Sequence, residues 1–170
     1  MNHDSYNQAA TYGQSSTHGA PGAWCDFNDA DAQQGEFNLI PKGTQALVRL
    51  MLMQRQHDER QQWNTRGFIS GYRGSPLGMV DQVIWKQGDQ FKDAGIEFVP
   101  AINEELGATQ VLGTQRVESD PERTVDGVFG LWYGKGPGVD RAGDALKHGN
   151  AYGSSPHGGV LVVAGDDHGC

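Results

Sequence analysis

The fold is decided by Ile96-Glu97-Phe98-Val99 and, one residue later, by Ala101-Ile102-Asn103-Glu104-Glu105-Leu106-Gly107-Ala108. The first stretch predicts a β-strand, and the second predicts the beginning of a helix. Two adjacent carboxylates, Glu104 and Glu105, therefore fall at a strand-to-helix turn, where open α/β sheets bind their ligands. The small residues after them, Gly107 among others, allow this helix to pack closely against a neighbour.

The composition of the chain limits the classes of function. The formal net charge is -8 over 170 residues, which argues against a nucleic-acid partner because such a surface needs a clustered basic patch. No run of about 18 apolar residues and no charged-then-apolar leader is present, so we expect neither a membrane partner nor secretion. Cys25 and Cys170 form no disulfide framework or metal motif, which favours a cytoplasmic location.

A change in composition divides the chain into two parts. Residues 1–36 are rich in Gly, Ser, Gln, Asn and His. They cannot bury enough apolar surface to offset the entropy of ordering, so we predict a flexible leader. Residues 37–170 have the composition of one domain. Since the chain stops directly after the predicted strand 160–164, we expect this domain to be incomplete at its C-terminus.

Helical and strand patterns alternate along this domain. The predicted helices span residues 44–63, 75–94, 103–117 and 139–148, and the predicted strands span 67–72, 96–99, 125–131 and 160–164. This alternation predicts an α/β fold, a parallel sheet flanked by helices. In the first helix we expect Met51 and Met53 to fill the core and the polar stretch 54–62 to be solvated.

Two glycine-rich loops, residues 73–78 and 132–138, each follow a predicted strand, and the second contains the aromatic residues Trp132 and Tyr133. The C-terminal ends of parallel strands share one edge of a sheet, so a ligand is expected along that edge. Ser75-Pro76 is typical of a helix start, and the N–H groups exposed there favour an anion such as phosphate or carboxylate. A tight turn that needs glycine for its backbone angles is an equally simple interpretation of the first segment.

Four motifs occur in an order and spacing that resemble one protein family. They are Gly71-Tyr72-Arg73-Gly74-Ser75-Pro76-Leu77-Gly78, Asn103-Glu104-Glu105-Leu106, Trp132-Tyr133-Gly134-Lys135-Gly136-Pro137-Gly138-Val139-Asp140-Arg141 and Ala164-Gly165-Asp166-Asp167-His168. Together they resemble the N-terminal region of the long, fused indolepyruvate ferredoxin oxidoreductases, which depend on thiamine diphosphate. The resemblance covers roughly residues 37–170.

The resemblance implies a division of labour within a longer enzyme. This region resembles the pyrimidine-binding domain of the thiamine-diphosphate-binding fold, while magnesium and 4Fe-4S clusters are expected to bind outside residues 1–170. The implied reaction is the oxidative decarboxylation of aryl pyruvates, a class of 2-oxoacid, with coenzyme A as acyl acceptor and ferredoxin as electron acceptor. The remaining domains of the same chain are implied partners. An exposed sheet edge favours association into a homo-oligomer when the protein is full length.

Glu104 is the residue to which the resemblance assigns acid/base chemistry. The family's cofactor is activated by proton exchange at N1' of its pyrimidine ring, and a carboxylate in water-poor surroundings, which raise its pKa, suits that task. The wider thiamine-diphosphate class places a glycine nine residues after this glutamate, and the spacing from Glu104 to Gly113 selects Glu104 over Glu105. Without the resemblance, a solvated or helix-capping pair would be the simpler interpretation.

Other site residues follow from the same comparison. The family places a small hydroxyl residue near the substrate, which corresponds to Ser75, although Ser75 could equally cap its helix. Arg73 and Lys135 are candidate partners for the substrate carboxylate. Many relatives have proline in place of Arg73, and Lys135 could also be a solvated lysine. Gly74 and Gly107 join Glu104 as candidate cofactor-binding residues.

Two alternative functions use the same residues. The glycine-rich segments also suit a non-catalytic phosphate- or nucleotide-binding α/β module, and the chain could be a redundant fragment with no independent role. Asp166, Asp167 and His168 have no assigned role, and no metal site is assigned within the chain.

Overall fold

The computed structural model describes residues 43–74 and 77–166. Its secondary structure confirms the predicted α/β class. The strands are β1 (Thr65–Gly71), β2 (Ile96–Phe98), β3 (Gly127–Lys135) and β4 (Gly159–Gly165). The helices are α2 (Gly43–Arg60), α3 (Met79–Lys86), α4 (Gly88–Asp93), α5 (Glu104–Thr114), α6 (Gly136–Arg141) and α7 (Gly143–Tyr152), with a short 3-10 turn, η2 (Val117–Ser119). The predicted leader lies outside the described residues.

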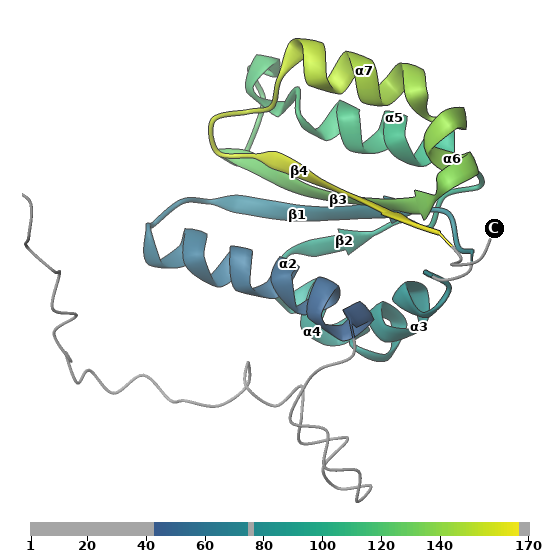
Figure 1. Cartoon of the computed structure of the whole chain (residues 1–170). Coiled ribbons are helices and arrows are strands. Elements are labelled where there is room, and N and C mark those ends of the chain that lie inside the picture. The colour runs from purple at the N-terminus through teal and green to yellow at the C-terminus, as the bar shows by residue number, and fades with distance from the viewer. Residues whose placement is uncertain (1–42, 75–76, 167–170) are drawn as a thin grey trace, which may run out of the picture. The chain divides into compact units, whose positions relative to one another are not determined.

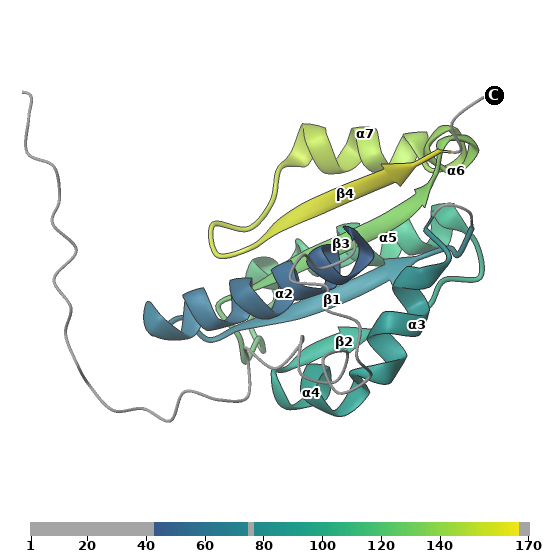
Figure 2. The ribbon, with the colours of Figure 1, turned by 60° about the horizontal axis from the view of Figure 1, so that its bottom comes forward.

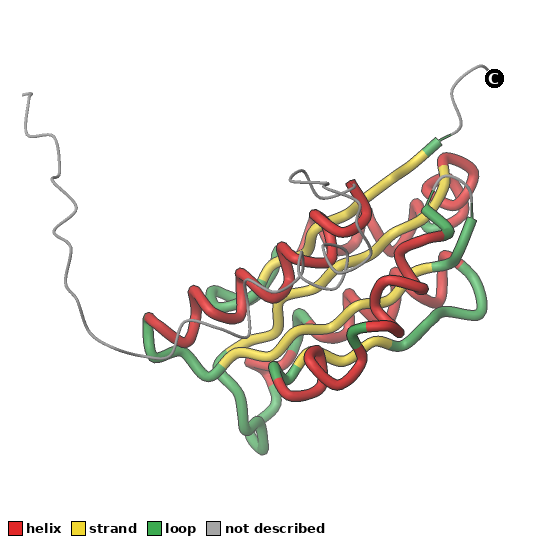
Figure 3. The backbone as a smooth tube through the Cα atoms, turned by 90° about the horizontal axis from the view of Figure 1, so that it is seen from below, coloured by secondary structure: helices red, strands yellow, loops and turns green. Residues whose placement is uncertain are grey.

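The four strands form one parallel sheet with the order β2-β1-β3-β4. Helices α2, α3 and α4 cover one face, and α5, α6 and α7 cover the other (Figures 1 and 2). The tube in Figure 3 shows the strands side by side, and the arrowheads in Figures 1 and 2 show that their C-terminal ends lie at the same edge. Among the described helices, none combines the length and the apolar character that a membrane span requires.

The connections between strands locate a reversal in the sheet. The chain leaves β1 through α3 and α4 on one face to reach β2, and it then crosses through α5 on the other face to reach β3. The next crossover, through α6 and α7, stays on the face of α5 and leads outward to β4. The direction of winding therefore changes between β1 and β3, and open sheets bind ligands outside the C-terminal ends of strands at such a switch point.

Apolar packing on the two faces follows the helical periodicity. On α2, Val48, Met51 and Leu52 are buried at spacings of three and four residues. On the opposite face, the buried cluster joins α5, β3 and α7 through Ala108, Val111, Trp132, Ala142 and Ala145. At about 25 cal/mol per Å² of apolar surface, each large core side chain contributes roughly 1.5–3 kcal/mol, so these layers fix the positions of the loops between them.

Two predictions about α2 were wrong. Met51 is buried as predicted, but Met53 is 51% exposed, because it lies two residues further round the helix. Asp58 lies in the stretch expected to be solvated, yet it is only 2% exposed. Its two carboxylate oxygens accept hydrogen bonds from Gln54 Nε2 at 2.7 Å and from Thr65 Oγ1 at 2.6 Å. These bonds satisfy the buried charge and explain its burial.

The helix predicted for residues 75–94 is two shorter helices. The first, α3, begins at Met79 rather than at Ser75, which lies outside the described residues with Pro76. The chain breaks at Gln87, whose φ of -105° and ψ of 16° are not helical, and resumes at Gly88 as α4. Glycine in a helix interior costs about 1 kcal/mol relative to alanine, so a break at this position is inexpensive. Ile84 in α3 and Phe91 in α4 are both buried.

The strand predicted for residues 125–131 extends four residues further than expected. Trp132 and Tyr133, assigned to a loop, lie inside β3 and are almost completely buried, and α6 begins directly after Lys135. β3 pairs with β1 on one side and with β4 on the other. A central strand covered on both faces tolerates a continuous apolar run, which does not show the alternation that marks a half-buried strand.

The last strand, β4, forms one edge of the described sheet. It pairs with β3 from Phe129↔Gly159 to Lys135↔Gly165. Its residues Val160, Leu161 and Val162 are 38%, 41% and 44% exposed. Exposure of successive residues, which point to opposite faces, shows that the described chain leaves both faces of β4 partly open.

Candidate functional site

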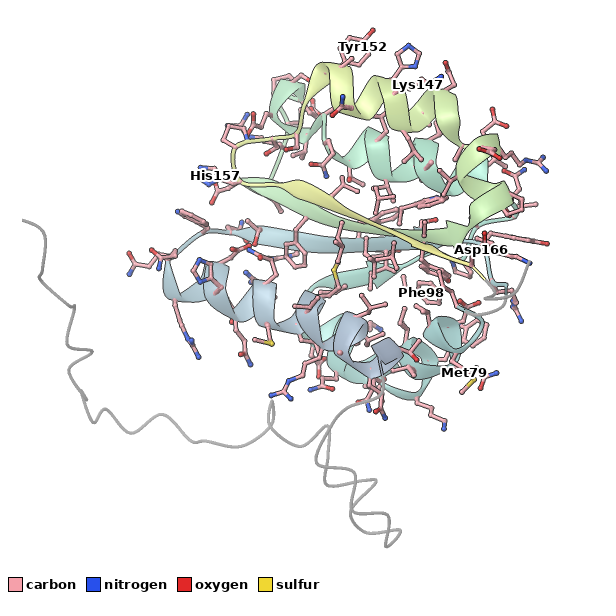
Figure 4. The ribbon with its side chains drawn as sticks, viewed as in Figure 1. Met79, Phe98, Lys147, Tyr152, His157 and Asp166 are labelled. Carbon is pink, nitrogen blue, oxygen red and sulfur yellow. The ribbon has the colours of Figure 1, made fainter. Side chains whose placement is uncertain are left out.

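The C-terminal ends of β1, β2 and β3 and the segments that follow them form the candidate site. The segment after β1 contains Arg73 and Gly74, the one after β2 leads into Glu104, and β3 ends at Lys135. The backbone N–H of Ala101 donates to Gly71 O at 3.0 Å, and that of Tyr72 donates to Tyr133 O at 3.2 Å. These bonds hold the three segments together beyond the regular strands. Figure 4 marks this edge by Asp166, at the opposite end of the sheet from His157.

Glu104 is held at this edge by the N-terminus of α5. Asn103 caps the helix, because its side-chain oxygen accepts from the N–H of Leu106 at 2.9 Å. The backbone oxygen of Glu104 accepts from Trp132 Nε1 at 3.1 Å, which ties the helix start to β3. A carboxylate in the first turn also interacts favourably with the helix dipole. The neighbouring Glu105 is exposed, whereas Glu104 is half-buried.

The side chain of Glu104 lies against α6 rather than in open solvent. A Cβ atom built on Gly138 would lie 2.5 Å from Cγ of Glu104 and 3.0 Å from its Oε1. These distances are shorter than real contacts, so only glycine at position 138 leaves room for the carboxylate where it lies. Gly138 therefore forms a cradle for the glutamate side chain.

Gly74 and Lys135 are brought together at the switch point. A Cβ atom on Gly74 would lie 2.8 Å from Cδ of Lys135, so the lysine stem crosses the glycine closely. Lys135 therefore lies against Gly74, and Gly138, three residues later, lies against Glu104. The structure therefore gathers segments that follow three different strands around the start of α6.

Arg73 is supported from two sides although it is exposed. Its Nε lies 3.4 Å from Oδ2 of Asp81, and its guanidinium carbon lies 5.4 Å from the ring centroid of Trp85. The second distance is within the range of a cation–π interaction. The side chain is 64% exposed, so it combines a defined position with access to solvent.

Gly107 and Gly113 differ in their surroundings. A Cβ atom on Gly107 would lie 3.0 Å from Cβ of Ala101 and 3.4 Å from Oγ of Ser70, so this glycine allows α5 to pack closely against β1. The contacts of Gly107 are with the end of β1 and with the segment that follows β2. Gly113 has nothing within 4 Å of the corresponding position, so packing in the described chain gives no reason for glycine there.

Asp81 is a site-proximal residue that the sequence analysis missed, and Tyr133 was noted only as a loop aromatic. The hydroxyl of Tyr133 donates to Oδ1 of Asp81, and both residues are at least 98% buried. Helical spacing contains the signal: Asp81 lies three residues before Ile84 and four after Leu77, both of them buried, so it shares their face.

Burial raises the pKa of the Tyr133 hydroxyl far above its ordinary value of about 10, and its hydrogen bond to Asp81 and the charge of that carboxylate add to the effect. The positive charge of Arg73 acts in the opposite direction. Tyr133 therefore stays protonated and donates to Asp81 at any physiological pH.

Comparisons of this chain with protein-family models, with characterised proteins and with solved structures found no match. The arrangement of the site residues must therefore be interpreted from its own chemistry. Among residues 43–74 and 77–166, no group of three or more His, Cys, Asp or Glu side chains is placed to hold a metal ion. Asp167 and His168 lie outside this range, and the carboxylate of Asp166 lies beside Gly136.

A cavity of about 400 Å³ lies between α5, α7 and β4, away from these residues. It is lined mainly by apolar side chains, including Val111, Trp132, Leu146 and Val162, and by none of Arg73, Glu104 and Lys135. The candidate site is thus separate from this cavity and is marked by its charged groups. It offers one half-buried carboxylate next to a cradle and two cations at the switch point.

Proposed function

We propose that this chain supplies the pyrimidine-side half of a thiamine-diphosphate site in an enzyme that oxidatively decarboxylates aryl pyruvates. The observation that carries the proposal is the half-buried carboxylate of Glu104, cradled by Gly138 at the C-terminal edge of a parallel sheet. The motifs that resemble indolepyruvate ferredoxin oxidoreductases lie in or beside this edge wherever the structure describes them. When bound, the cofactor would supply a carbon nucleophile for the 2-oxoacid carbonyl.

The residues present fit such a group. Glu104 would hold and exchange one proton at a ring nitrogen, which requires a carboxylate with limited access to water. Its backbone is fixed by Trp132 and its side chain by Gly138, so the carboxylate is positioned before any ligand arrives. Gly74 would act through Lys135, because it leaves room for the lysine stem beside the loop after β1. Arg73 and Lys135 would attract the carboxylate of the 2-oxoacid.

Exposed apolar side chains at the same edge support a site completed by a second domain. Ile102 is 83% exposed, Leu106 is 47% exposed and Tyr72 is 41% exposed. Several large apolar side chains exposed at one edge are typical of a surface that another domain covers. A domain that covers this edge would exclude water from Glu104. Magnesium and the iron–sulfur clusters would bind to such further domains. Coenzyme A and ferredoxin would be the other reactants.

The first test compares Glu104→Ala with Glu105→Ala in the enzyme assembled from this chain and the proposed further domains. We expect loss of the acid/base group to lower indolepyruvate-dependent ferredoxin reduction by about 10²–10⁴-fold. Glu105 is the matched control, since it is an adjacent glutamate that is exposed, and its variant should keep most of the turnover. Equal activity of the two variants would remove the catalytic role of Glu104. The 170-residue chain alone should show no turnover.

The second test uses glycine to displace the same carboxylate without removing it. Gly138→Ala places a methyl group where the Glu104 side chain lies, and a misplaced catalytic group can cost about 10²-fold in rate. Gly143→Ala is the control, because nothing lies within 4 Å of its Cβ position. The free energy of unfolding should change by no more than about 1 kcal/mol in Gly143→Ala, whereas Gly138→Ala adds an overpacking cost of about 1–3 kcal/mol, so activity is compared between folded proteins. A phosphate-binding module without catalysis would show neither activity nor this contrast.

A further inference from the structure

Asp81 is a buried carboxylate to which the proposed reaction assigns no role. It lies in the first turn of α3 and is 2% exposed. Its Oδ1 accepts the hydrogen bond from Tyr133, and its Oδ2 lies 3.4 Å from Nε of Arg73. The loop after β1, the helix α3 and the strand β3 therefore meet at one carboxylate. A buried carboxylate needs such partners, but this need alone does not require an exposed arginine as one of them.

Tyr133 fixes the orientation of this carboxylate. The tyrosine is 1% exposed, and its hydroxyl stays protonated, so it is a permanent donor to Oδ1. With Oδ1 engaged, Oδ2 is the oxygen that faces Arg73. The position of the arginine thus depends on a chain of contacts that begins in the core of β3.

Arg73 has its Nε side turned toward Asp81 and its face toward Trp85. An arginine presents five N–H donors in a planar fork, and its two terminal nitrogens suit a carboxylate bound by two parallel hydrogen bonds. A long side chain that is already held loses less conformational freedom when a ligand binds. Arg73 also lies just beyond the end of β1, beside the switch point of the sheet.

We propose that Asp81 and Tyr133 are positioning residues that hold Arg73, with Trp85 as a second support, in place to bind the carboxylate of a 2-oxoacid. The identity of this ligand rests on the proposed function, whereas the positioning itself rests on the contacts. If Asp81 has a purely structural role and only joins α3 to β3, any effect of its substitution on ligand affinity should be the same with or without Arg73.

The first measurement follows the Nε–H resonance of Arg73 in the ¹⁵N-labelled 170-residue chain, identified by its loss in Arg73→Lys. In the wild type we expect a resonance displaced from the position of solvated arginines. Asp81→Asn should return it to that position, while Tyr133→Phe and Trp85→Leu should move it part of the way. Asp89→Asn, an exposed acid in the first turn of α4, should leave it unchanged. A resonance unaffected by Asp81→Asn in a folded chain would overturn the positioning.

The second measurement titrates phenylpyruvate, as a probe, into the same proteins. Asp81→Asn should weaken binding by about fivefold, and Tyr133→Phe by about two- to threefold. In a background of Arg73→Lys, adding Asp81→Asn should change the affinity by less than about 1.5-fold, because Asp81 acts through the arginine. Circular dichroism verifies that each variant is folded, and if Asp81→Asn is not, the Tyr133→Phe and Trp85→Leu variants provide the same test.

The outcomes separate this inference from the proposed function. Equal affinity in the wild type and in folded Asp81→Asn, or an equal loss in the Arg73→Lys background, would overturn the positioning role and leave the proposed function standing. A wild-type Arg73 resonance that does not respond to phenylpyruvate would overturn the carboxylate-binding role. The proposed function fails separately, if Glu104→Ala and Glu105→Ala are equally active.

Discussion

Asp58 and Asp81 are two carboxylates that the fold buries to the same extent, 2% exposed in each case, near opposite ends of the sheet. Each accepts a hydrogen bond from a buried hydroxyl, Thr65 for Asp58 and Tyr133 for Asp81. Their second partners differ. Asp58 completes its bonding with the neutral side chain of Gln54, whereas Asp81 faces the cation of Arg73, which is 64% exposed.

The second partner thus distinguishes Asp58, whose contacts are within the fold, from Asp81, which contacts an exposed side chain. The bonds of Asp58 join the end of α2 to the start of β1 and involve no charged partner. Asp81 connects the core to an exposed cation at the edge where Glu104 also lies. Carboxylates with similar burial and similar hydroxyl partners therefore differ in their second partner, and only the one that faces an exposed cation enters our proposal of ligand binding.

The largest expected effect on stability comes from Asp58→Ala. It leaves the completely buried Thr65 hydroxyl without its acceptor, and an unsatisfied buried polar group together with lost packing costs about 2–4 kcal/mol. The free energy of unfolding in urea measures this loss. Glu59→Ala is the control, since Glu59 is 51% exposed and pairs with Arg55 one turn earlier in the helix, a contact worth about 0.5 kcal/mol or less. Similar losses in the two variants would mean that the Asp58 contacts do not stabilise the chain.

The second largest effect is a pH dependence of stability that should distinguish the Asp81 site from the Asp58 site. Tyrosine in the unfolded chain ionises near pH 10, while burial and Asp81 raise the pKa of Tyr133 in the folded chain. Above pH 10 the unfolded state therefore releases a proton that the folded state retains. The free energy of unfolding should fall by up to about 1.4 kcal/mol per pH unit, and the contribution of Tyr133 is fully present only below pH 10.

Urea unfolding at pH 9, 10 and 11 measures this slope, which should be shallower in Tyr133→Phe than in the wild type. The Asp58 site has no counterpart, because the Thr65 hydroxyl does not titrate in this range. Parallel slopes in the wild type and in Tyr133→Phe would contradict the assignment.

The smallest expected effect on stability comes from Arg73→Gln. The arginine is mostly exposed, and one partly screened ion pair is worth less than about 1 kcal/mol. Loss of the guanidinium should nevertheless abolish the binding of phenylpyruvate, so this variant separates ligand binding from folding stability. A loss of stability as large as that of Asp58→Ala would show that Arg73 is part of the core structure.

The sequence was sufficient to predict the α/β class, the parallel sheet and the helix start at Glu104. These depend on local signals: apolar runs, their alternation with helical patterns, and Asn103 before two acids. The edge at which Arg73, Glu104 and Lys135 are found followed from the same pattern, because the ends of parallel strands must share one edge.

The sequence was insufficient where contacts between distant residues decide the structure. The burial of Asp58 depends on Thr65, and that of Asp81 depends on Tyr133, 52 residues further along the chain. Tyr133 was itself assigned to a loop, because a strand covered on both faces has no alternating pattern. The contact between Glu104 and Gly138 is also non-local, because α5 and β3 separate the two residues along the chain. Gly113, chosen by spacing, has no packing role within the described residues.

Within the part of the chain that the structure describes, β4 has no strand on its outer side, and this bears on association between copies of the chain. From Gly159 to Gly165 the strand contains no charged residue and no proline, the two features that natural proteins use as gatekeepers against misassociation. Its outer N–H and C=O groups can accept another strand, and Val160, Leu161 and Val162 offer that strand an apolar surface. We therefore expect association of the polypeptide through β4 to increase with its concentration, and Val162→Lys, which adds a charge to this strand, to reduce it.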